Sequence, residues 1–283
     1  MRRRAMISGS AAIMLASTSL IFSGEVNGQA PLLLGVTTST DNSGLLAHLL
    51  DVFEAEHDIE VRAIAAGTGA ILNMASRGDV SAVLVHAPEA EATFIQDGYG
   101  IDRRAVMHNR FVIVGPISDP ARIQEQGRAA DAFAAIARHE SLFLSRGDES
   151  GTHLAEQRLW QAAGVDLNDK PALNSWYRES GSGQGATLNI AVNLGAYCLT
   201  DEATWATFDN PGELKTLFDR DETMTNNPYS IILVNPERFS KINNDAATIF
   251  ADWLTSKKGQ AAISSFKIQG QQPFRVAWPP HGL

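Results

Sequence analysis

Residues 32–56 read LLLGVTTSTDNSGLLAHLLDVFEAE. The apolar run at 32–36 predicts a buried strand, and the leucines and Phe53 that recur along one face of 44–56 predict a helix. The hydroxyl-rich stretch Thr37–Gly44 lies between them. This unit predicts an α/β fold in which polar loops follow the carboxyl ends of buried strands.

The same alternation continues along the chain. We expect a strand at 59–65, a helix at 71–77 and a strand at 82–85. This β-α-β-α-β order predicts a mostly parallel sheet with helices on both faces. A second α/β alternation, which includes an expected strand at 142–145, occupies the middle of the chain.

Two similar segments mark the ends of this middle part. Residues 111–116 (FVIVGP) and 231–236 (IILVNP) are each an apolar run that ends in proline. Two crossovers between two lobes explain the similarity. We therefore expect lobe 1 at 31–112 and 235–283, and lobe 2 at 113–234. A single continuous domain is the alternative.

The first 30 residues have the three-part layout of a secretory signal. Basic residues at 2–4 precede apolar sequence to about residue 22, and Gly28-Gln29-Ala30 is a small-x-small cleavage pattern. A membrane anchor is the alternative interpretation of the apolar run. We expect a cleaved signal peptide at 1–30, a periplasmic location and a soluble, monomeric mature chain, while the secretory and twin-arginine routes both stay open.

Charge and cysteine content narrow the class of protein further. The formal net charge of −9 argues against nucleic acid as a partner. Cys198 is the only cysteine, so the chain has no internal disulfide, and no cysteine follows the signal as a site of lipid attachment. Cys198 lies in an apolar run that predicts a buried strand.

Four loops that open expected helices are rich in small hydroxyls or glycine. They are residues 37–44, 67–69, 145–153 and 181–187. A helix N-terminus has unpaired N–H groups and partial positive charge, so it binds anions where glycine lets the backbone approach. Arg146 adds a fixed charge and a planar fork of donors, which Asp148 orients. Helix capping explains each loop singly, whereas four such loops from both lobes favour an anion site.

Catalytic motifs are missing from the sequence. There is no nucleophile elbow with a central serine, no phosphate-loop lysine motif and no two-histidine zinc helix. We interpret His86 and His153, which lie near the predicted cleft, as structural residues. A Ser150–His153 pair could mimic a nucleophile and its base, so a secreted hydrolase is kept as an alternative. We expect no enzymatic activity, no cofactor and no metal ion bound directly by side chains.

Five stretches resemble the tungstate-binding proteins of ABC transporters, within the type II periplasmic binding proteins. They are residues 37–45, 83–91, 145–153, 185–191 and 270–274. The resemblance runs from about residue 32 to 275, and it implies a two-lobed fold with two hinge crossovers. It implies ligand contacts from Thr37 or its neighbours, Thr68, Arg146 and Thr152. Together with the loop analysis, the candidate oxyanion-binding residues are Thr37, Thr38, Ser39, Thr68, Arg146, Ser150, Gly151, Thr152 and Thr187.

Tungstate is the expected ligand, and the permease of an ABC importer is the expected partner. Molybdate has the same charge and almost the same size, so both oxyanions remain open. The segment Arg146–Thr152 also resembles the loop of phosphate-binding proteins, which use a carboxylate to accept the proton of hydrogen phosphate. Here the third strand ends in His86-Ala87-Pro88, with no Asp. Tungstate carries no proton at neutral pH, so neutral donors and one arginine suit it better than phosphate.

Overall fold

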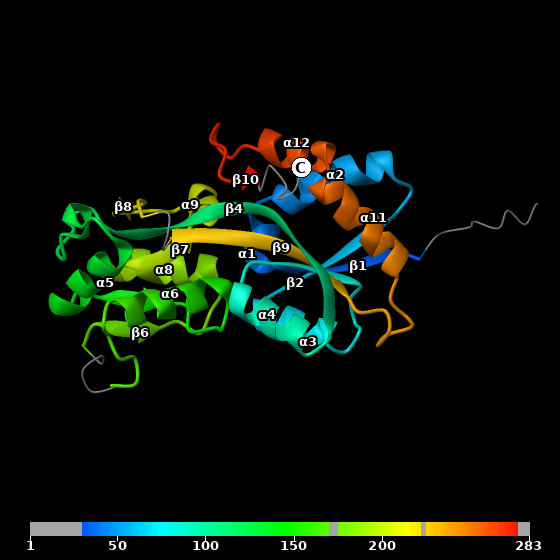
Figure 1. Ribbon diagram of the computed structural model, residues 1–283. Helices are drawn as coiled ribbons and strands as arrows, with labels where there is room; N and C mark the ends of the chain where they lie inside the picture. Colours follow the sequence, from blue (N-terminus) through cyan, green and yellow to red (C-terminus); the bar gives the residue numbers. More distant parts are fainter. Residues whose placement is uncertain (1–29, 170–174, 222–224, 277–283) are drawn as a thin grey trace, which may run out of the picture.

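The computed structural model describes residues 30–169, 175–221 and 225–276. The chain forms two α/β lobes joined by two long strands (Figure 1). The predicted signal peptide lies outside the described residues, apart from Ala30. No helix in the described ranges is long and apolar enough to cross a membrane.

Strands form at the apolar runs that predicted them, and also at 177–179, 214–218 and 275–276, where no strand was predicted. They are β1 (Leu32–Thr37), β2 (Val61–Ala66), β3 (Ala82–Val85), β4 (Gly100–Pro116), β5 (Phe143–Ser145), β6 (Tyr177–Glu179), β7 (Cys198–Asp201), β8 (Leu214–Phe218), β9 (Asn226–Val234) and β10 (Arg275–Val276). The first lobe is built on a sheet of order β10-β4-β9-β3-β1-β2. In the second lobe β4 pairs with β7 and β8, and β5 pairs with β6.

Helices cover both sheets. They are α1 (Thr38–Asn42), α2 (Leu45–Glu56), α3 (Thr68–Ala75), α4 (Pro88–Gln96), α5 (Ala129–Arg138), α6 (Gly151–Ala162), α8 (Gln184–Leu194), α9 (Glu202–Ala206), α11 (Asn244–Thr255) and α12 (Lys257–Ser265), with a 3-10 turn η1 at Ile123–Glu125. In the first lobe α2, α11 and α12 lie on one side of the sheet, and α3 and α4 lie on the other (Figure 1). The β-α-β-α-β order predicted for residues 32–85 is confirmed, and α1 is an additional short helix in the expected first loop.

The prediction of mostly parallel sheets needs a correction at the strands that link the lobes. β1 is parallel to β2 and β3, and β5 is parallel to β6. β9, however, runs antiparallel to β3 and β4, and β4 runs antiparallel to β7 and β8. The reason is topological: β9 returns from the second lobe, so it must oppose strands whose carboxyl ends point toward that lobe.

β4 takes part in both sheets. Its residues 100–110 pair with β9, and its residues 111–116 pair with β7 and β8. The division of the chain into lobes at 112 and 235 stays a prediction, but its second boundary does not match the strand pairing. Residues 226–234, expected in lobe 2, pair with β3 and β4 of the first sheet. The apolar run at 231–234 is the end of this strand, and its polar beginning gave no strand signal.

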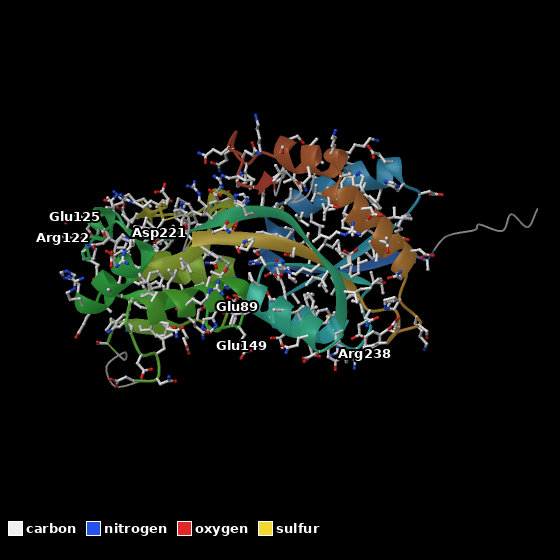
Figure 2. The ribbon with its side chains drawn as sticks, in the orientation of Figure 1. Glu89, Arg122, Glu125, Glu149, Asp221 and Arg238 are labelled. Carbon is white, nitrogen blue, oxygen red and sulfur yellow. The ribbon has the colours of Figure 1, made fainter. Side chains whose placement is uncertain are left out.

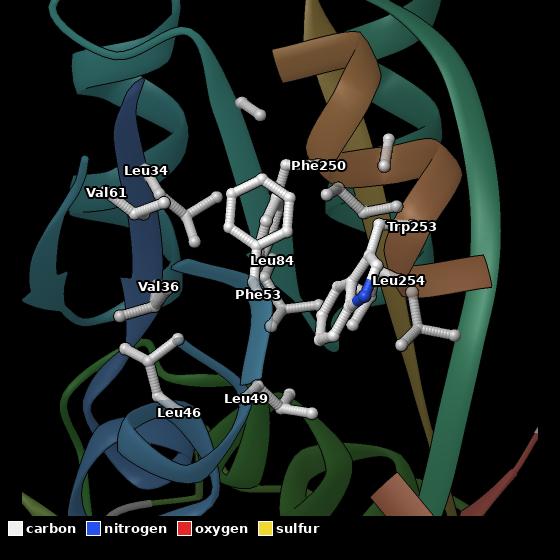
Figure 3. Packing of buried hydrophobic residues seen from close by; sticks show 14 of the residues in the cluster. Leu34, Val36, Leu46, Leu49, Phe53, Val61, Leu84, Phe250, Trp253 and Leu254 are labelled. Carbon is white, nitrogen blue, oxygen red and sulfur yellow. The ribbon is translucent and has the colours of Figure 1, made fainter. Parts of the chain in front are cut away.

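Each lobe has an apolar core on both faces of its sheet. In the first lobe Leu34 and Leu84 pack with Phe53 and Phe250 on one face (Figure 3). A separate cluster under α3 and α4 fills the other face. In the second lobe Cys198 is fully buried beside α8, which confirms the expected buried strand. Burial of apolar area on both faces holds each sheet rigidly, so that the loops at the strand ends have fixed positions.

Candidate functional site

β1, β2 and β3 all point their carboxyl ends toward the second lobe, and polar residues follow each strand. Thr37 ends β1, with its Oγ1 2.8 Å from Thr40 Oγ1 and 3.2 Å from Ser39 Oγ. Thr37 and Ser39 are buried, and Thr38 is partly exposed. The three predicted residues of the first loop therefore lie together at one strand end.

Thr68 opens α3 next to this group. The register of β1 and β2 places Thr37 opposite Ala66, so the two strand ends are adjacent. Thr68 is 1% exposed, and its Oγ1 has no hydrogen-bond partner among the described residues. A buried hydroxyl without a partner costs free energy, which makes this atom a candidate donor to a ligand.

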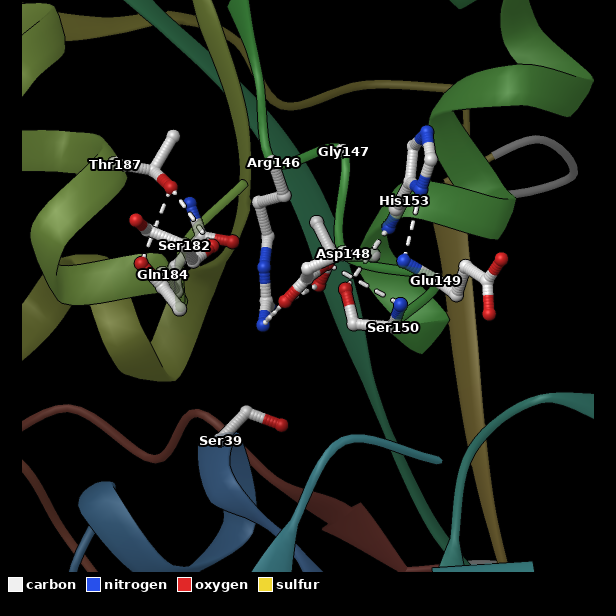
Figure 4. A network of polar contacts seen from close by, with 12 residues as sticks. Ser39, Arg146, Gly147, Asp148, Glu149, Ser150, His153, Ser182, Gln184 and Thr187 are labelled. Carbon is white, nitrogen blue, oxygen red and sulfur yellow. Dashed lines mark hydrogen bonds and ion pairs between the residues drawn. The ribbon is translucent and has the colours of Figure 1, made fainter. Parts of the chain in front are cut away.

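Arg146 follows β5 in the second lobe and is 3% exposed. Its Nη2 donates a 2.5 Å hydrogen bond to Asp148 Oδ2, which confirms that Asp148 orients it. Its Nη1 lies 3.5 Å from Thr152 Oγ1, at the long limit of a hydrogen bond, and its Nε has no partner among the described residues. Figure 4 shows the side chain extending toward the side on which Ser39 lies. A buried guanidinium with an unused N–H group is favourable only if an acceptor joins it.

The residues after Arg146 begin α6. Ser150 caps this helix, because its Oγ accepts a 3.3 Å hydrogen bond from the backbone N–H of His153. The backbone N–H of Ser150 donates to Asp148 Oδ1 at 3.2 Å. Gly151 and Thr152 occupy the first turn, where backbone N–H groups have no acceptor within the helix. Thr152 is buried beside Arg146.

The ring nitrogens of His153 have partners other than the Ser150 hydroxyl. Its Nδ1 accepts a 3.0 Å hydrogen bond from the backbone N–H of Glu149, and its Nε2 lies 3.2 Å from the amide of Gln157. Both ring nitrogens are therefore engaged away from the Ser150 hydroxyl. Burial lowers the pKa of His153, with the nearby Asp148 carboxylate opposing the shift.

Thr187 has a different environment from the other predicted ligands. Its Oγ1 lies 2.7 Å from Ser180 Oγ, and 3.1 Å from each of the carbonyl oxygens of Ser182 and Gly183. Its hydroxyl therefore has acceptors close to its own helix, and Figure 4 shows Thr187 beside Ser182. Ser180 in turn donates to the carbonyl oxygen of Arg146 at 3.2 Å. Thr187 thus braces the arginine loop, and its contact with a ligand stays a prediction.

The two lobes touch at His86, a residue that sequence analysis had interpreted as structural. A methyl group built on Gly151 would lie 2.8 Å from two atoms of the His86 ring. His86 is 4% exposed, and its Nε2 is 3.1 Å from Ser39 Oγ. Burial lowers the pKa of His86 to about 4, although the nearby Asp201 carboxylate and the hydrogen bond to Asn227 oppose the shift.

Glu156 is a buried acid behind the site that sequence analysis did not identify. It lies on α6, and its Oε1 accepts hydrogen bonds of 3.0 Å from both Trp160 Nε1 and the Tyr177 hydroxyl. Burial raises the pKa of Glu156 to about 7. The available signal was its position on the same helix face as Leu159 and Trp160.

The candidate oxyanion site therefore has donors from two lobes and one buried guanidinium. A separate groove of about 590 Å³, lined by Arg110, Trp205 and Phe208 among others, shares no residue with the donor loops. We take the donor loops as the site because they hold buried hydrogen-bond donors that find no partner within the described part of the chain, and such donors suit a small anion.

Comparisons with known proteins support the fold. A PBP superfamily domain matches residues 23–258. The tungstate-binding protein TupA of Peptoclostridium acidaminophilum is 34% identical over 244 residues, which cover 86% of this chain and 83% of that protein. The structure of the tungstate ABC transporter from Geobacter sulfurreducens has a TM-score of 0.76 at 41% identity, covering 85% of this chain and 100% of that one. The tungstate-binding protein TupA of Desulfovibrio alaskensis G20 has a TM-score of 0.74 at 40% identity, covering 87% and 99% respectively.

Proposed function

Because the chain belongs to the PBP superfamily, and within it to the tungstate-binding proteins of ABC transporters, we propose that it captures a tungstate dianion between its lobes and delivers it to an ABC importer. Molybdate is the second ion that the site would take. The observation that carries the proposal is a pair of buried donors, one in each lobe, that have no partner among the described residues: Thr68 Oγ1 and Arg146 Nε.

The donors suit an anion that carries no proton. Asp148 already receives Arg146 Nη2 on one carboxylate oxygen and the N–H of Ser150 on the other. β3 leads into His86-Ala87-Pro88 without a carboxylate. Hydrogen phosphate would need an acceptor for its proton, so this donor set supports tungstate over the phosphate alternative.

The same geometry argues against hydrolysis. A nucleophilic serine needs a base within about 2.6–3.2 Å of its hydroxyl oxygen. Ser150 instead uses its Oγ to cap α6, and both ring nitrogens of His153 have other partners. We therefore propose a binding protein without turnover rather than a secreted hydrolase.

Delivery and location complete the proposal. We propose that the chain acts as a monomer in the periplasm, after removal of residues 1–30, and that the closed, loaded form is recognised by the membrane permease. The support for export is the signal layout of residues 1–30.

Isothermal calorimetry of the mature chain with tungstate, molybdate, phosphate and sulfate tests the ligand. Charge-assisted hydrogen bonds of about 1.5–3 kcal/mol each, from several converging donors, support dissociation constants in the nanomolar range after ordering costs. We expect tungstate and molybdate to bind in that range, and phosphate and sulfate to bind far more weakly. Phosphate binding as tight as tungstate binding would overturn the choice of ligand.

A further inference from the structure

His86 lies where the two lobes meet, and residues of both lobes pack against its ring. The ring stacks on Tyr229 of β9 with centroids 4.6 Å apart. Gly151 of the second lobe also lies against the ring, because an added Cβ there would lie 2.8 Å from ring atoms Cε1 and Nδ1 and 3.0 Å from the His86 carbonyl oxygen. The lobes can approach this closely only because residue 151 has no side chain.

A chain of buried hydrogen bonds links this ring to both lobes. His86 Nε2 is 3.1 Å from Ser39 Oγ, and His86 Nδ1 is 2.9 Å from Asn227 Oδ1. Asn227 Nδ2 donates to Asn109 Oδ1 at 2.7 Å, and Asn109 Nδ2 donates to Asp201 Oδ1 at 3.1 Å. Asn109 and Asn227 are opposite each other where β4 pairs with β9. The chain thus runs from the predicted ligand loop, through the paired linking strands, to the second lobe.

Asp201 fixes the direction of every bond in this chain. Its Oδ1, which is 3.1 Å from Asn109 Nδ2, also accepts hydrogen bonds from the backbone N–H groups of Ala203 and Thr204, at 3.1 and 3.0 Å, so this oxygen acts as an acceptor. Asn109 must therefore offer its NH₂ group to Asp201 and its oxygen to Asn227. Asn227 in turn donates its NH₂ group to Asn109, so its amide oxygen faces His86.

This direction defines the state of His86 and Ser39. The ring must carry its proton on Nδ1 to donate to Asn227, and the burial that lowers its pKa to about 4 keeps it neutral near pH 7. Nε2 then has a lone pair, so the Ser39 hydroxyl donates to it. The hydrogen of Ser39 is used inside the protein, which makes Ser39 a supporting residue of the first loop rather than a donor to the anion.

We propose that His86 is a positioning residue for anion capture: it fixes Ser39 through one ring nitrogen and sets how closely the lobes can meet through its contact with Gly151. The inference rests on the proposed function, since it concerns closure around the captured anion. His86 and Gly151 are on different lobes, so their contact belongs to the closed form, and substitution at Gly151 should affect capture without disturbing either core.

A double-mutant cycle with Gly151→Ala and His86→Ala tests the contact. Tungstate affinity is measured by calorimetry, and lobe closure by the radius of gyration with and without tungstate. We expect Gly151→Ala alone to weaken binding about 5- to 150-fold, as for other overpacked contacts, and to reduce the tungstate-induced compaction. In the His86→Ala background the loss of affinity caused by Gly151→Ala should be at least about fivefold smaller. Some loss should remain, because the added methyl group would still lie close to the backbone carbonyl oxygen of residue 86.

Two controls separate this effect from general damage. Gly127→Ala introduces the same methyl group where nothing lies within 4 Å, and should leave the affinity unchanged. The melting temperature of ligand-free Gly151→Ala should not fall, because alanine suits the first turn of a helix. The proposed contact would be overturned if Gly151→Ala reduced tungstate affinity equally in both backgrounds, or in neither.

A measurement without ligand tests the hydrogen-bond chain on its own. Nitrogen-15 NMR of the histidine-labelled mature chain reports which ring nitrogen of His86 carries the proton, with His86→Ala identifying the signal. We expect Nδ1 to be protonated and Nε2 to be unprotonated; the opposite tautomer would refute the direction of the chain. If wild-type protein fails to bind tungstate while this tautomer is found, the proposed function fails and the hydrogen-bond chain stands.

Discussion

Arg158 on α6 donates a 2.8 Å hydrogen bond to the carboxylate of Glu89 on α4, so an ion pair joins the two lobes at the protein surface. Figure 2 shows Glu89 where α4 approaches the second lobe. The two side chains are 42% and 65% exposed, so water and salt screen the pair strongly. This pair and the buried contact between His86 and Gly151 both join the lobes, and they should contribute unequally to closure.

The exposed pair should have only a small effect on capture. Exposed ion pairs contribute about 0.2–1 kcal/mol, so Arg158→Ala should weaken tungstate binding by no more than about fivefold. The difference should vanish in high salt. Titrations at two ionic strengths check this, with the charge-swapped double variant Glu89→Arg/Arg158→Glu as the control that should recover the affinity. A loss of a hundredfold would mean that this contact, rather than the buried one, dominates closure.

Arg146 should contribute far more to tungstate affinity than the ion pair between Arg158 and Glu89. Removal of one partner of a buried charged contact costs about 2–5 kcal/mol, so Arg146→Ala should weaken tungstate binding by roughly 30- to several-thousand-fold. Arg146→Lys should also weaken it, because an ammonium group cannot reproduce the planar fork of donors. Calorimetry and thermal unfolding of the same variants are the measurements.

Asp148→Asn distinguishes ligand binding from loop support. If Arg146 only pairs with Asp148 to hold the loop, both Arg146→Ala and Asp148→Asn should lower the melting temperature while the tungstate affinity changes by less than about threefold. We expect the opposite pattern for Arg146→Ala, with a folded protein that binds tungstate poorly.

The sequence predicted the parts of the fold that depend on local patterns. The strands expected at 32–36 and 82–85 were recognisable because a run of apolar residues alone predicts a buried strand. The beginning of β9 was not, since Asn226, Asn227 and Pro228 resemble a loop until β4 supplies their pairing partners. Local propensity does not encode such long-range pairing.

Some residues of the candidate site could also be predicted from local sequence, and others could not. Arg146 and Thr68 stand in motifs beside glycine and hydroxyls, so they could be found from sequence. Asn109 and Asn227 are single polar residues within strands, and no spacing rule connects two positions so far apart in the chain. Only the register of β4 with β9 places their side chains together.

Glu156 should make stability depend on pH in an unusual direction. Burial raises its pKa to about 7 from the ordinary 4.5, so the folded chain keeps a proton that the unfolded chain has lost. This stabilising contribution is complete below about pH 4.5 and is lost as the pH rises through 7, a change on the order of 3 kcal/mol. Urea unfolding from pH 5 to 8 should show this decline in wild type.

Glu156→Gln is the matched variant, since its amide oxygen can still accept from Trp160 and Tyr177. The free energy of unfolding of wild type should fall relative to that of Glu156→Gln as the pH rises. Parallel curves for the two proteins over this range would show that Glu156 is ionised in the fold.

Thr68→Val separates a ligand donor from a structural hydroxyl. Thr68 Oγ1 is buried and has no partner among the described residues, so its replacement by a methyl group of the same shape breaks no hydrogen bond within them. The variant should therefore be at least as stable as wild type without ligand, because an unsatisfied buried hydroxyl is unfavourable. If that hydroxyl donates to tungstate, the affinity should fall by about 1.5–3 kcal/mol, or roughly 10- to 150-fold. Thr68→Ser keeps the donor and should bind within about fivefold of wild type. Wild-type affinity in Thr68→Val would remove Thr68 from the site, and lower stability without ligand would mean that the hydroxyl supports the fold instead.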